Sequence, residues 1–475
     1  MTSTKPGSIA PLDPEAVAPF YRQIYDRFRG AIASGVLKPG DRIPSARALT
    51  KELGLARGTI ETAYSLLAAE GYIQARGQAG TIVTPDLQPG MAVPKPLPLP
   101  QSGPDTISFR PDSILPFQMG LPALDMFPRK IWARLGARCV RAMQPTDMVH
   151  PPVFGLPELR AEIAAYLRLS RGIDCAPSQV FVTSGYRHSI ELIGHALLKA
   201  GDRVWLENPG YPPTRDLLTH LDIAAVPVPV DRDGMVVAEA IRLAPDARAA
   251  VVTPAHQSPL GVSLSLPRRL ALLDWAAQAK AWVIEDDYDG EYHYVSRPLP
   301  ALKSLDRDGR VLYAGTFSKV LLPSIRLAYL VVPDPLVARF EQISQAFAGG
   351  SPHLTQAIVT AFITEGHFAR HIQRMRKLYA ERREVTIAGL QAVLGEQVRI
   401  DAQPGGMHLI LRLQGQQSDR TLVTRMREAG LYAEALSDWT IGPVGPSALL
   451  VNFTNIESQA MAETLGGRIL TLLMA

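Results

Sequence analysis

The sequence predicts a chain of two parts, a small domain of three helices and a β-hairpin followed by a large α/β domain. Three observations support this division. A proline-rich stretch separates two regions, the first has the apolar periodicity of short helices, and the second alternates apolar strands with helices. The chain has 475 residues, 47% hydrophobic and 20% charged, so it can bury a sizeable core and is not a disordered chain.

Cysteine usage and hydropathy exclude several classes of protein. Two cysteines, Cys139 and Cys175, supply neither a disulfide framework nor a cysteine-based zinc site, and we identify no metal site. No apolar run is long enough to cross a membrane, and the N-terminal residues lack the pattern of a signal peptide. We therefore expect a cytoplasmic protein with no membrane partner.

The boundary between the two parts is set by proline. Residues 85–105 contain seven prolines, a density that removes amide donors and favours extended chain. We predict a first domain at residues 14–84, a proline-rich linker at 85–105 and a second domain at 106–475. Residues 1–85 hold ten basic and seven acidic side chains, so +3 of the net charge of +4 lies there, a distribution that suits contact with nucleic acid.

The first domain has the outline of a winged helix-turn-helix. Apolar residues recur at helical spacing in three segments that end near Gly35, at Gly54 and at Gly71. Ser45 can cap the second helix, and the third begins near Arg57. Two short strands, residues 72–74 and 81–83, then flank a glycine-rich hairpin tip.

This outline predicts a DNA-binding surface. In such a domain the start of the third helix meets base edges in the major groove, while the second helix and the wing lie at the phosphate backbone. The residues at these places, which we expect to bind double-stranded DNA, are Arg47, Arg57, Thr59, Arg76 and Gly80.

The first domain resembles the DNA-binding domain of GntR-type bacterial regulators. The resemblance covers roughly 65 residues and includes GVLKPGDRIPSARAL, which matches the specific core of the family motif. The sequence departs from the family at Ala56, where a serine or threonine is usual, and at Glu61 in the recognition helix. The resemblance implies an operator DNA as partner and leaves its sequence open.

The sequence pattern of the second domain predicts an α/β fold. Short apolar strands that end in polar or glycine residues alternate with helical stretches such as Ser189–Ala200 and Arg268–Lys280. The strands are FVTSG, RVWLENPG, AAVVTPAHQ, AWVIEDDYD, RVLYAGTFSK and LAYLVVP. No GxGxxG or GxxxxGK[ST] follows the first strand, which disfavours dinucleotide and P-loop binding. Ligands of such sheets bind at the carboxyl ends of strands.

One strand end presents groups suited to an aldehyde that carries a phosphate. The segment RVLYAGTFSK delivers Thr316, Ser318 and Lys319, and Arg326 follows seven residues later. The lysine amine would form a Schiff base with the aldehyde. The two hydroxyls and the guanidinium would bind phosphate oxygens.

Other strand ends add groups suited to a pyridine ring. Asp286 could pair with a protonated ring nitrogen, and Tyr288 could bond a ring hydroxyl. Tyr211 offers an aromatic face for stacking. Ser184, Gly185 and Tyr186 open a helix whose backbone amides can cradle phosphate. Each motif alone is more often an ordinary loop or turn, and it is their joint occurrence in one α/β order that favours a site.

The second domain resembles fold type I aminotransferases, in the form fused to GntR heads in MocR-type regulators. The motifs that carry the resemblance are ENPGYP, TPAHQSPLG, IEDDYDGEY, YAGTFSK, LPSIRLAYL and PGGMH. It implies pyridoxal 5'-phosphate (PLP) as cofactor, with Lys319 as the internal aldimine lysine and Asp286 at the pyridine nitrogen. It further implies Tyr288 near the ring hydroxyl, Tyr211 on the ring, and Ser184, Gly185, Thr316, Ser318 and Arg326 around the phosphate. It also implies a domain-swapped, head-to-tail homodimer.

Two departures from the aminotransferase pattern bear on the ligand. Ser258–Gly261 reads SPLG where asparagine-proline-x-glycine is usual, which weakens a typical contact to the ring hydroxyl. Leu450 stands where aminotransferases and the GABA-responsive regulator have the arginine that clamps the substrate carboxylate. A standard α-carboxylate would then lack its bidentate partner, and Arg215 or His256 could hold the effector instead.

Three interpretations follow. The first is a transcriptional regulator that senses an amine, an amino acid or PLP itself through the Lys319 aldimine. The second is an active aminotransferase with a DNA-binding head, against which Leu450 argues, although partial transamination stays possible. The third is a scaffold without cofactor, which Lys319, Asp286 and Arg326 disfavour. We expect the first, in the bacterial cytoplasm and at the nucleoid when bound to DNA.

Overall fold

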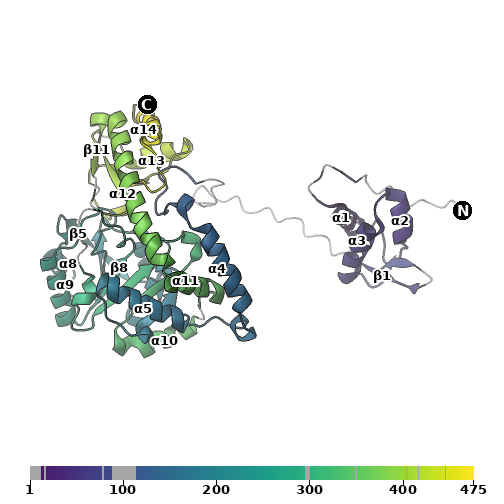
Figure 1. Cartoon of the computed structure of the whole chain (residues 1–475), viewed down its shortest axis with the longest axis horizontal. Coiled ribbons are helices and arrows are strands. Elements are labelled where there is room, and N and C mark those ends of the chain that lie inside the picture. Colours follow the sequence, from purple (N-terminus) through teal and green to yellow (C-terminus); the bar gives the residue numbers. More distant parts are fainter. Residues whose placement is uncertain are drawn as a thin grey trace. The chain divides into compact units, whose positions relative to one another are not determined.

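The chain divides into two compact units, Met1–Arg110 and Pro111–Ala475, shown in Figure 1. The computed structural model describes residues 12–14, 16, 18–77, 80–87, 114–294, 300–347, 350–401, 403, 405–415, 417–443 and 445–474. Most of the predicted linker, residues 88–105, lies outside the described residues, and its predicted boundaries stay predictions.

The small unit has the three helices and the hairpin that the sequence predicts. Its elements are α1 (Phe20–Ala33), α2 (Ala46–Leu53), α3 (Arg57–Ala69), β1 (Ile73–Ala75) and β2 (Thr81–Val83), and the two strands pair antiparallel. The Ser45 hydroxyl accepts a hydrogen bond from the Ala48 amide and so caps α2. Gly54 ends that helix in the left-handed conformation, with φ +67°.

The core of the small unit lies between the three helices and the strands. The buried side chains are Ile24, Tyr25, Phe28, Ile43, Leu49, Ile60, Ala63, Tyr64, Leu67, Ile73 and Val83. Tyr64 also donates a hydrogen bond to the Pro44 carbonyl at 2.7 Å, which ties α3 to the segment that precedes α2. The helix at the predicted DNA surface is therefore fixed by packing.

The large unit is built on an eight-stranded sheet of order β3-β10-β9-β8-β7-β4-β5-β6. Strands β9, β8, β7, β4 and β5 run parallel, whereas β10 is antiparallel to both its neighbours and β6 is antiparallel to β5. The bounds are β3 Val180–Thr183, β4 Arg203–Asn208, β5 Ala224–Asp231, β6 Gly234–Met235, β7 Ala249–Val252, β8 Trp282–Asp287, β9 Val311–Thr316 and β10 Ala328–Val331.

Helices cover both faces of this sheet (Figure 1). Along β9 and β10, alternate residues enter different apolar clusters: Leu312 and Leu330 pack with α6, whereas Tyr313 and Tyr329 pack with α5. The helices of this part are α4 Arg129–Ala142, α5 Pro157–Arg171, α6 Tyr186–Leu197, α7 Pro212–His220, α8 Val237–Leu243, α9 Leu266–Ala279, α10 Val337–Ala346 and α11 His353–Thr364. The parallel strands thus have buried faces on both sides.

A second, antiparallel sheet of order β11-β12-β14-β13 follows. It packs against α12, α13 and α14 in one apolar cluster, visible around β11 in Figure 1. The bounds are α12 His367–Leu394, β11 Val398–Asp401, β12 His408–Leu413, α13 Asp419–Glu428, β13 Glu434–Ala435, β14 Ala448–Asn452 and α14 Gln459–Met474. The single-turn helices are η2 Leu124–Met126, η3 Pro145–Met148, η4 Pro177–Gln179, η5 Leu302–Leu305, η6 Pro323–Ile325, η7 Asp334–Leu336, η8 Gly395–Gln397 and η9 Leu436–Trp439.

The fold confirms the predicted α/β class and the strands predicted in the second domain. The predicted helices Ser189–Ala200 and Arg268–Lys280 correspond to α6 and α9 with ends shifted by one to three residues. The antiparallel sheet was not predicted. Among the described residues, no helix is long and apolar enough to cross a membrane.

Candidate functional site

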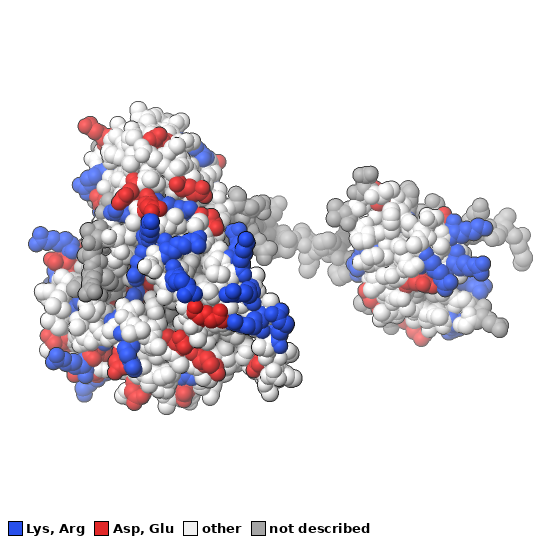
Figure 2. All heavy atoms as spheres, viewed as in Figure 1, with Lys and Arg blue, Asp and Glu red and all other residues white. Residues whose placement is uncertain are grey.

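The predicted DNA-contacting residues lie on α2, α3 and the hairpin of the small unit. Arg47, Arg57 and Arg76 are exposed and Thr59 is half-buried. Figure 2 shows basic side chains gathered on the side of this unit where α2 lies. Arg57 forms an ion pair with Glu61 at 2.7 Å, with the Arg57 side chain 73% exposed. The unusual Glu61 thus pairs with Arg57, the single arginine of α3.

The hairpin contains one feature that sequence reasoning missed. Gly80 has φ +82°, and a Cβ atom there would lie 3.2 Å from Arg42 Nε. Arg42 is exposed and is bridged to Ile82 of β2. The absence of a side chain at Gly80 therefore leaves space for the basic side chain of Arg42 beside the wing. The sequence could have indicated Arg42 through its place in the motif PGDRIPS. The DNA contacts of these residues stay predictions.

In the large unit, most of the predicted ligand-binding residues surround one cavity of about 320 Å³. It lies at the carboxyl ends of β8 and β9, where ligands bind in sheets of this kind. The predicted residues that line it are Gly185, Tyr186, Tyr211, Asp286, Tyr288, Thr316, Ser318, Lys319 and Arg326. Residues that lie far apart in sequence are thus brought together by the ends of the strands.

Lys319 lines this cavity. Its amine donates a hydrogen bond to the Gly120 carbonyl at 3.0 Å. Gly120 has φ +76°, a conformation that favours glycine, and a Cβ atom there would lie 2.5 Å from Lys319 Nζ and would displace the amine. Burial lowers the pKa of the Lys319 amine. A larger fraction is then neutral and nucleophilic than for a lysine in water.

Two adjacent carboxylates at the end of β8 face different surroundings, because side chains alternate along a strand. Asp286 lines the cavity, and its pKa is raised by burial and then by the nearby Asp287 charge. Asp287 lies 2.5 Å from Arg171 Nε and accepts a hydrogen bond from Tyr313 at 2.5 Å. Burial disfavours the Asp287 charge, but Arg171 and Tyr313 outweigh it and lower the pKa. Asp287 is therefore an anchor of the fold, whereas Asp286 faces the cavity.

One end of the cavity is built to attract an anion. Helix α6 begins after Gly185, which has φ +137°, and its first amides have no side-chain cap. Arg326 lies against this helix start, since a Cβ atom on Gly185 would lie 3.6 Å from the guanidinium. Among the described residues no carboxylate lies within ion-pair distance of Arg326. Thr316 and Ser318 line the same cavity.

Ser184 differs from this group because it does not line the cavity. Its amide donates to His188 Nδ1 at 3.1 Å, and its hydroxyl lies 3.2 Å from the same nitrogen. The Ser184 amide and hydroxyl therefore both contact the His188 side chain in the first turn of α6. Its predicted contact with phosphate stays a prediction.

Aromatic side chains form the walls of the cavity. The Tyr211 ring lies 5.6 Å from Trp439 and 5.9 Å from Tyr186. The Tyr186 hydroxyl hydrogen-bonds Thr214 Oγ1 at 2.8 Å. The Tyr288 hydroxyl lies 2.9 Å from His256 Nδ1. These bonds fix the rings that would face a planar ligand.

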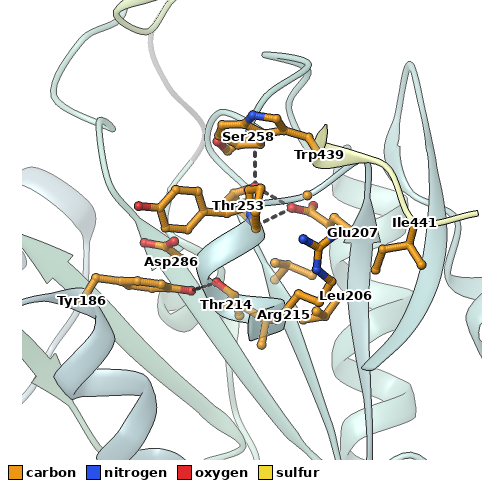
Figure 3. Close-up of a pocket in the computed structure, with 15 residues that line it drawn as sticks. Tyr186, Leu206, Glu207, Thr214, Arg215, Thr253, Ser258, Asp286, Trp439 and Ile441 are labelled. Atoms are coloured by element: carbon orange, nitrogen blue, oxygen red, sulfur yellow. Dashed lines mark hydrogen bonds between the residues drawn. The ribbon is translucent and has the colours of Figure 1, made fainter. Parts of the chain in front are cut away.

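The two predicted effector residues do not line this cavity. His256 is buried behind Tyr288, and its Nδ1 also lies 3.1 Å from Asp289. Arg215 lines a smaller cavity of about 30 Å³ behind Tyr211, shown in Figure 3. Direct contact between these residues and an effector stays a prediction.

Several cavity residues were missed by sequence reasoning. They are Met119, Gly120, Arg187, Pro323, Met407, His408, Glu434 and Trp439. Met407 and His408 belong to the PGGMH motif, and this motif could have indicated that they lie near the site. Glu434 and Trp439 belong to the antiparallel sheet and to η9, and no sequence pattern marked them.

Leu450, at the expected place of a carboxylate-binding arginine, lies in β14. It is fully buried in an apolar cluster with Ile410, Leu436, Trp439 and Ala448. In the sheet register Leu450 pairs with Glu434 of β13. An apolar side chain and an acidic neighbour thus occupy this region.

Comparison with known proteins matches each of the two units to a known family. Residues 20–83 match the family model for bacterial regulatory proteins of the gntR family, and residues 122–466 match the model for aminotransferase class I and II. The chain is 36% identical to the probable rhizopine catabolism regulatory protein MocR of Rhizobium meliloti, over 95% of this chain and 93% of that protein. It is 34% identical to the pyridoxine biosynthesis transcriptional regulator PdxR of Corynebacterium glutamicum, over 95% of each.

Solved aminotransferases share the fold of the large unit. The α-aminoadipate aminotransferase LysN of Thermus thermophilus, complexed with N-(5'-phosphopyridoxyl)-L-leucine, has a TM-score of 0.69 and 26% identity. The match covers 76% of this chain and 93% of that one. An archaeal alanine:glyoxylate aminotransferase has a TM-score of 0.70 and 25% identity, over 76% and 90%.

A helix-turn-helix domain joined to an aminotransferase-like domain defines a class of composite transcriptional regulators. This chain belongs to that class, and within it to the MocR-type branch of the GntR family.

The different surroundings of Asp286 and Asp287 predict different effects on stability. In the protein without ligand, Asp287→Asn should lower the free energy of unfolding by about 3 kcal/mol, because it leaves the buried Arg171 charge with weaker compensation. Asp286→Asn should leave it unchanged or raise it, because it removes a charge that burial disfavours. Urea denaturation followed by tryptophan fluorescence measures both, since all five tryptophans lie after residue 110. Equal losses would contradict the assignment of the two carboxylates.

Glu207, at the end of β4, predicts a dependence of stability on pH. Its Oε2 accepts hydrogen bonds from the Thr253 amide and hydroxyl (Figure 3), whereas its Oε1 is buried without a hydrogen-bond partner. Burial raises the pKa of Glu207 from 4.5 to about 7. The folded state therefore binds the proton more tightly than the unfolded chain, and this carboxyl costs stability as the pH rises from 4.5 through 7.

We expect Glu207→Gln to remove that cost. Relative to the wild type, its free energy of unfolding should increase by about 2 kcal/mol between pH 5 and pH 8. The matched control is Glu457→Gln, because Glu457 is exposed and should show no such trend. A difference between Glu207→Gln and wild type that is independent of pH would refute the raised pKa.

Proposed function

We propose that this regulator binds PLP in the cavity of the large unit and uses it to sense a small molecule that carries an amine. The observation that carries the proposal is the meeting of three groups around one cavity. These are the buried Lys319 amine, the Asp286 carboxylate and the anion-attracting end formed by Arg326 and the start of α6. PLP has an aldehyde, a basic ring nitrogen and a phosphate, which these groups complement in turn.

The residues present fit this cofactor. A raised pKa at Asp286 indicates a carboxylate that lacks compensation, and a protonated ring nitrogen beside it would supply the compensating charge. Lys319 would supply the amine for covalent attachment, and Thr316, Ser318 and Arg326 would bind the phosphate. Tyr211 would stack on the ring, and Tyr288 would bond the ring hydroxyl. When bound, PLP supplies an aldehyde carbon that condenses with primary amines.

The small unit would bind an operator DNA through α3 and the wing. We propose that the effector, an amine, an amino acid or PLP itself, shifts the equilibrium between two arrangements of a homodimer with exchanged heads. Such a shift requires different affinities of the effector for the two arrangements. The apolar Leu450 in place of a basic residue supports sensing over turnover, because a substrate carboxylate would not be oriented for proton transfer.

Covalent attachment predicts a spectroscopic effect of Lys319→Ala. The wild-type chain with added PLP should show the visible absorbance band of a lysine-bound cofactor, and Lys319→Ala should lose it completely. Lys199→Ala is the matched control, because Lys199 is exposed and lies on the loop after α6. A wild-type chain with no such band would overturn the cofactor proposal. Only the proposal that the small unit binds DNA would then remain.

Base contact by Arg57 predicts a loss of specificity. A duplex selected by the wild-type chain from a random pool should bind Arg57→Ala about 1–3 kcal/mol more weakly, whereas binding to unselected DNA should change little. Arg47→Ala provides the comparison, since a phosphate contact should weaken both duplexes equally. Gel-shift titrations at fixed salt measure this, and the cofactor absorbance should not change. Equal losses for Arg57→Ala on both duplexes would mean that Arg57 contacts phosphate.

A further inference from the structure

The cavity contains a carboxylate that the cofactor does not use. Glu434, in the short strand β13, lines the cavity together with Lys319 and Tyr211. One oxygen accepts a hydrogen bond from the Tyr432 hydroxyl at 3.0 Å, and the other accepts one from Trp439 Nε1 at 3.1 Å. A carboxylate can accept about four hydrogen bonds. Glu434 therefore keeps the capacity to bind a further donor.

Glu434 has no ion-pair partner among the described residues. Burial raises the pKa of its carboxyl. The hydrogen bonds from Tyr432 and Trp439, and then the charges of Lys319 and Arg427, act against this rise without cancelling it. Arg427 lies over the Tyr432 ring, 5.7 Å from its centre. A cationic group in the cavity would therefore gain a charge-assisted hydrogen bond with Glu434 and relieve its uncompensated burial.

Apart from the exposed Arg187, this region presents apolar or neutral side chains to a ligand. Its apolar side is formed by the cluster that contains Leu450 and Trp439, with Met119 packed against it. His408 donates from Nε2 to the Pro259 carbonyl at 2.8 Å, and burial lowers its pKa to about 4, so it is neutral at physiological pH. Arg187 lines the cavity but is exposed.

We propose that the sensed molecule is a diamine. Its first amine would replace the Lys319 amine on the aldehyde carbon of the cofactor, so that one C–N bond forms as the other breaks and Lys319 is released as a free amine, and its second, protonated amine would bind Glu434. This inference rests on the proposed function and specifies the class of effector. The Glu434 carboxylate next to apolar Leu450 reverses the charge preference that an arginine at position 450 would give. Tyr432 and Trp439 hold the carboxylate in place, so the second ammonium group meets an acceptor that is already oriented.

Three probes with four-carbon chains test the charge preference without any mutation. Putrescine, butylamine and γ-aminobutyrate share one primary amine and end in an ammonium, a methyl and a carboxylate group. Each is titrated into the full-length chain loaded with PLP, and the change of the cofactor absorbance gives the half-saturating concentration. We expect putrescine to act at a concentration at least about tenfold lower than butylamine, and γ-aminobutyrate to be the weakest, because a charge-assisted hydrogen bond contributes that much.

The variant Glu434→Gln identifies the group responsible. It should raise the half-saturating concentration of putrescine about tenfold or more, to the level of butylamine, and leave butylamine unchanged. Glu428→Gln, at an exposed site on the neighbouring helix α13, should behave as wild type. Tryptophan fluorescence and the cofactor band before titration report whether each variant is folded and loaded.

The outcomes separate the two proposals. A wild-type chain without the band of lysine-bound cofactor overturns the proposed function. A chain that shows the band but responds equally to putrescine and butylamine, or better to γ-aminobutyrate, overturns the diamine inference alone. A preference for putrescine that survives in folded Glu434→Gln also overturns it, because another group would then bind the second amine.

Discussion

The buried ion pair between Arg171 and Asp287 is the interaction on which the site depends. Arg171 ends α5 and contacts both Asp287, at 2.5 Å, and Glu291, at 2.8 Å. These two carboxylates lie on either side of the segment that contains Tyr288 and Asp289. The pair therefore fixes the end of β8 and the loop that follows it. Asp286 and Tyr288 are directed to the cavity because Asp287 and Glu291 are held by Arg171.

Burial without an ion-pair partner among the described residues gives the cavity its chemistry. Asp286, Lys319 and Glu434 all have pKa values shifted toward the neutral form, in each case with burial as the largest cause. Asp287 is as deeply placed, yet its pKa is lowered, because Arg171 compensates it. A folded chain that carries uncompensated polar groups around one cavity gains most from a ligand that compensates them. The same burial that costs stability thus selects the ligand.

The sequence predicted most of one half of the cavity and little of the other. Lys319, Asp286 and Tyr211 follow strands or turns with recognisable local patterns, and parallel strands bring their carboxyl ends to one edge of a sheet. Glu434 and Trp439 come from a two-residue strand and a single turn, elements too short for periodicity to reveal. Their position depends on long-range pairing of β13 with β14. Arg215 and His256, the two effector candidates, show the same limit. Neither lines this cavity, because residue type alone does not tell which side of Tyr211 or Tyr288 a side chain occupies, and their contact with an effector stays a prediction.

The two sheets of the large unit meet at the residues that surround this ligand region. The Gly210 amide donates to the Trp439 carbonyl at 3.0 Å, and Asn208 exchanges two hydrogen bonds with the Ile441 backbone at 3.0 and 2.8 Å. These bonds join the end of β4, next to Tyr211, to the chain that follows Glu434. A ligand held between Lys319, which follows β9 of the large sheet, and Glu434 on the small sheet would bridge both parts. Because such a ligand would contact both sheets, its affinity would depend on how the two sheets are placed relative to each other. Sensing by a regulator requires such a difference in affinity between two arrangements of the protein.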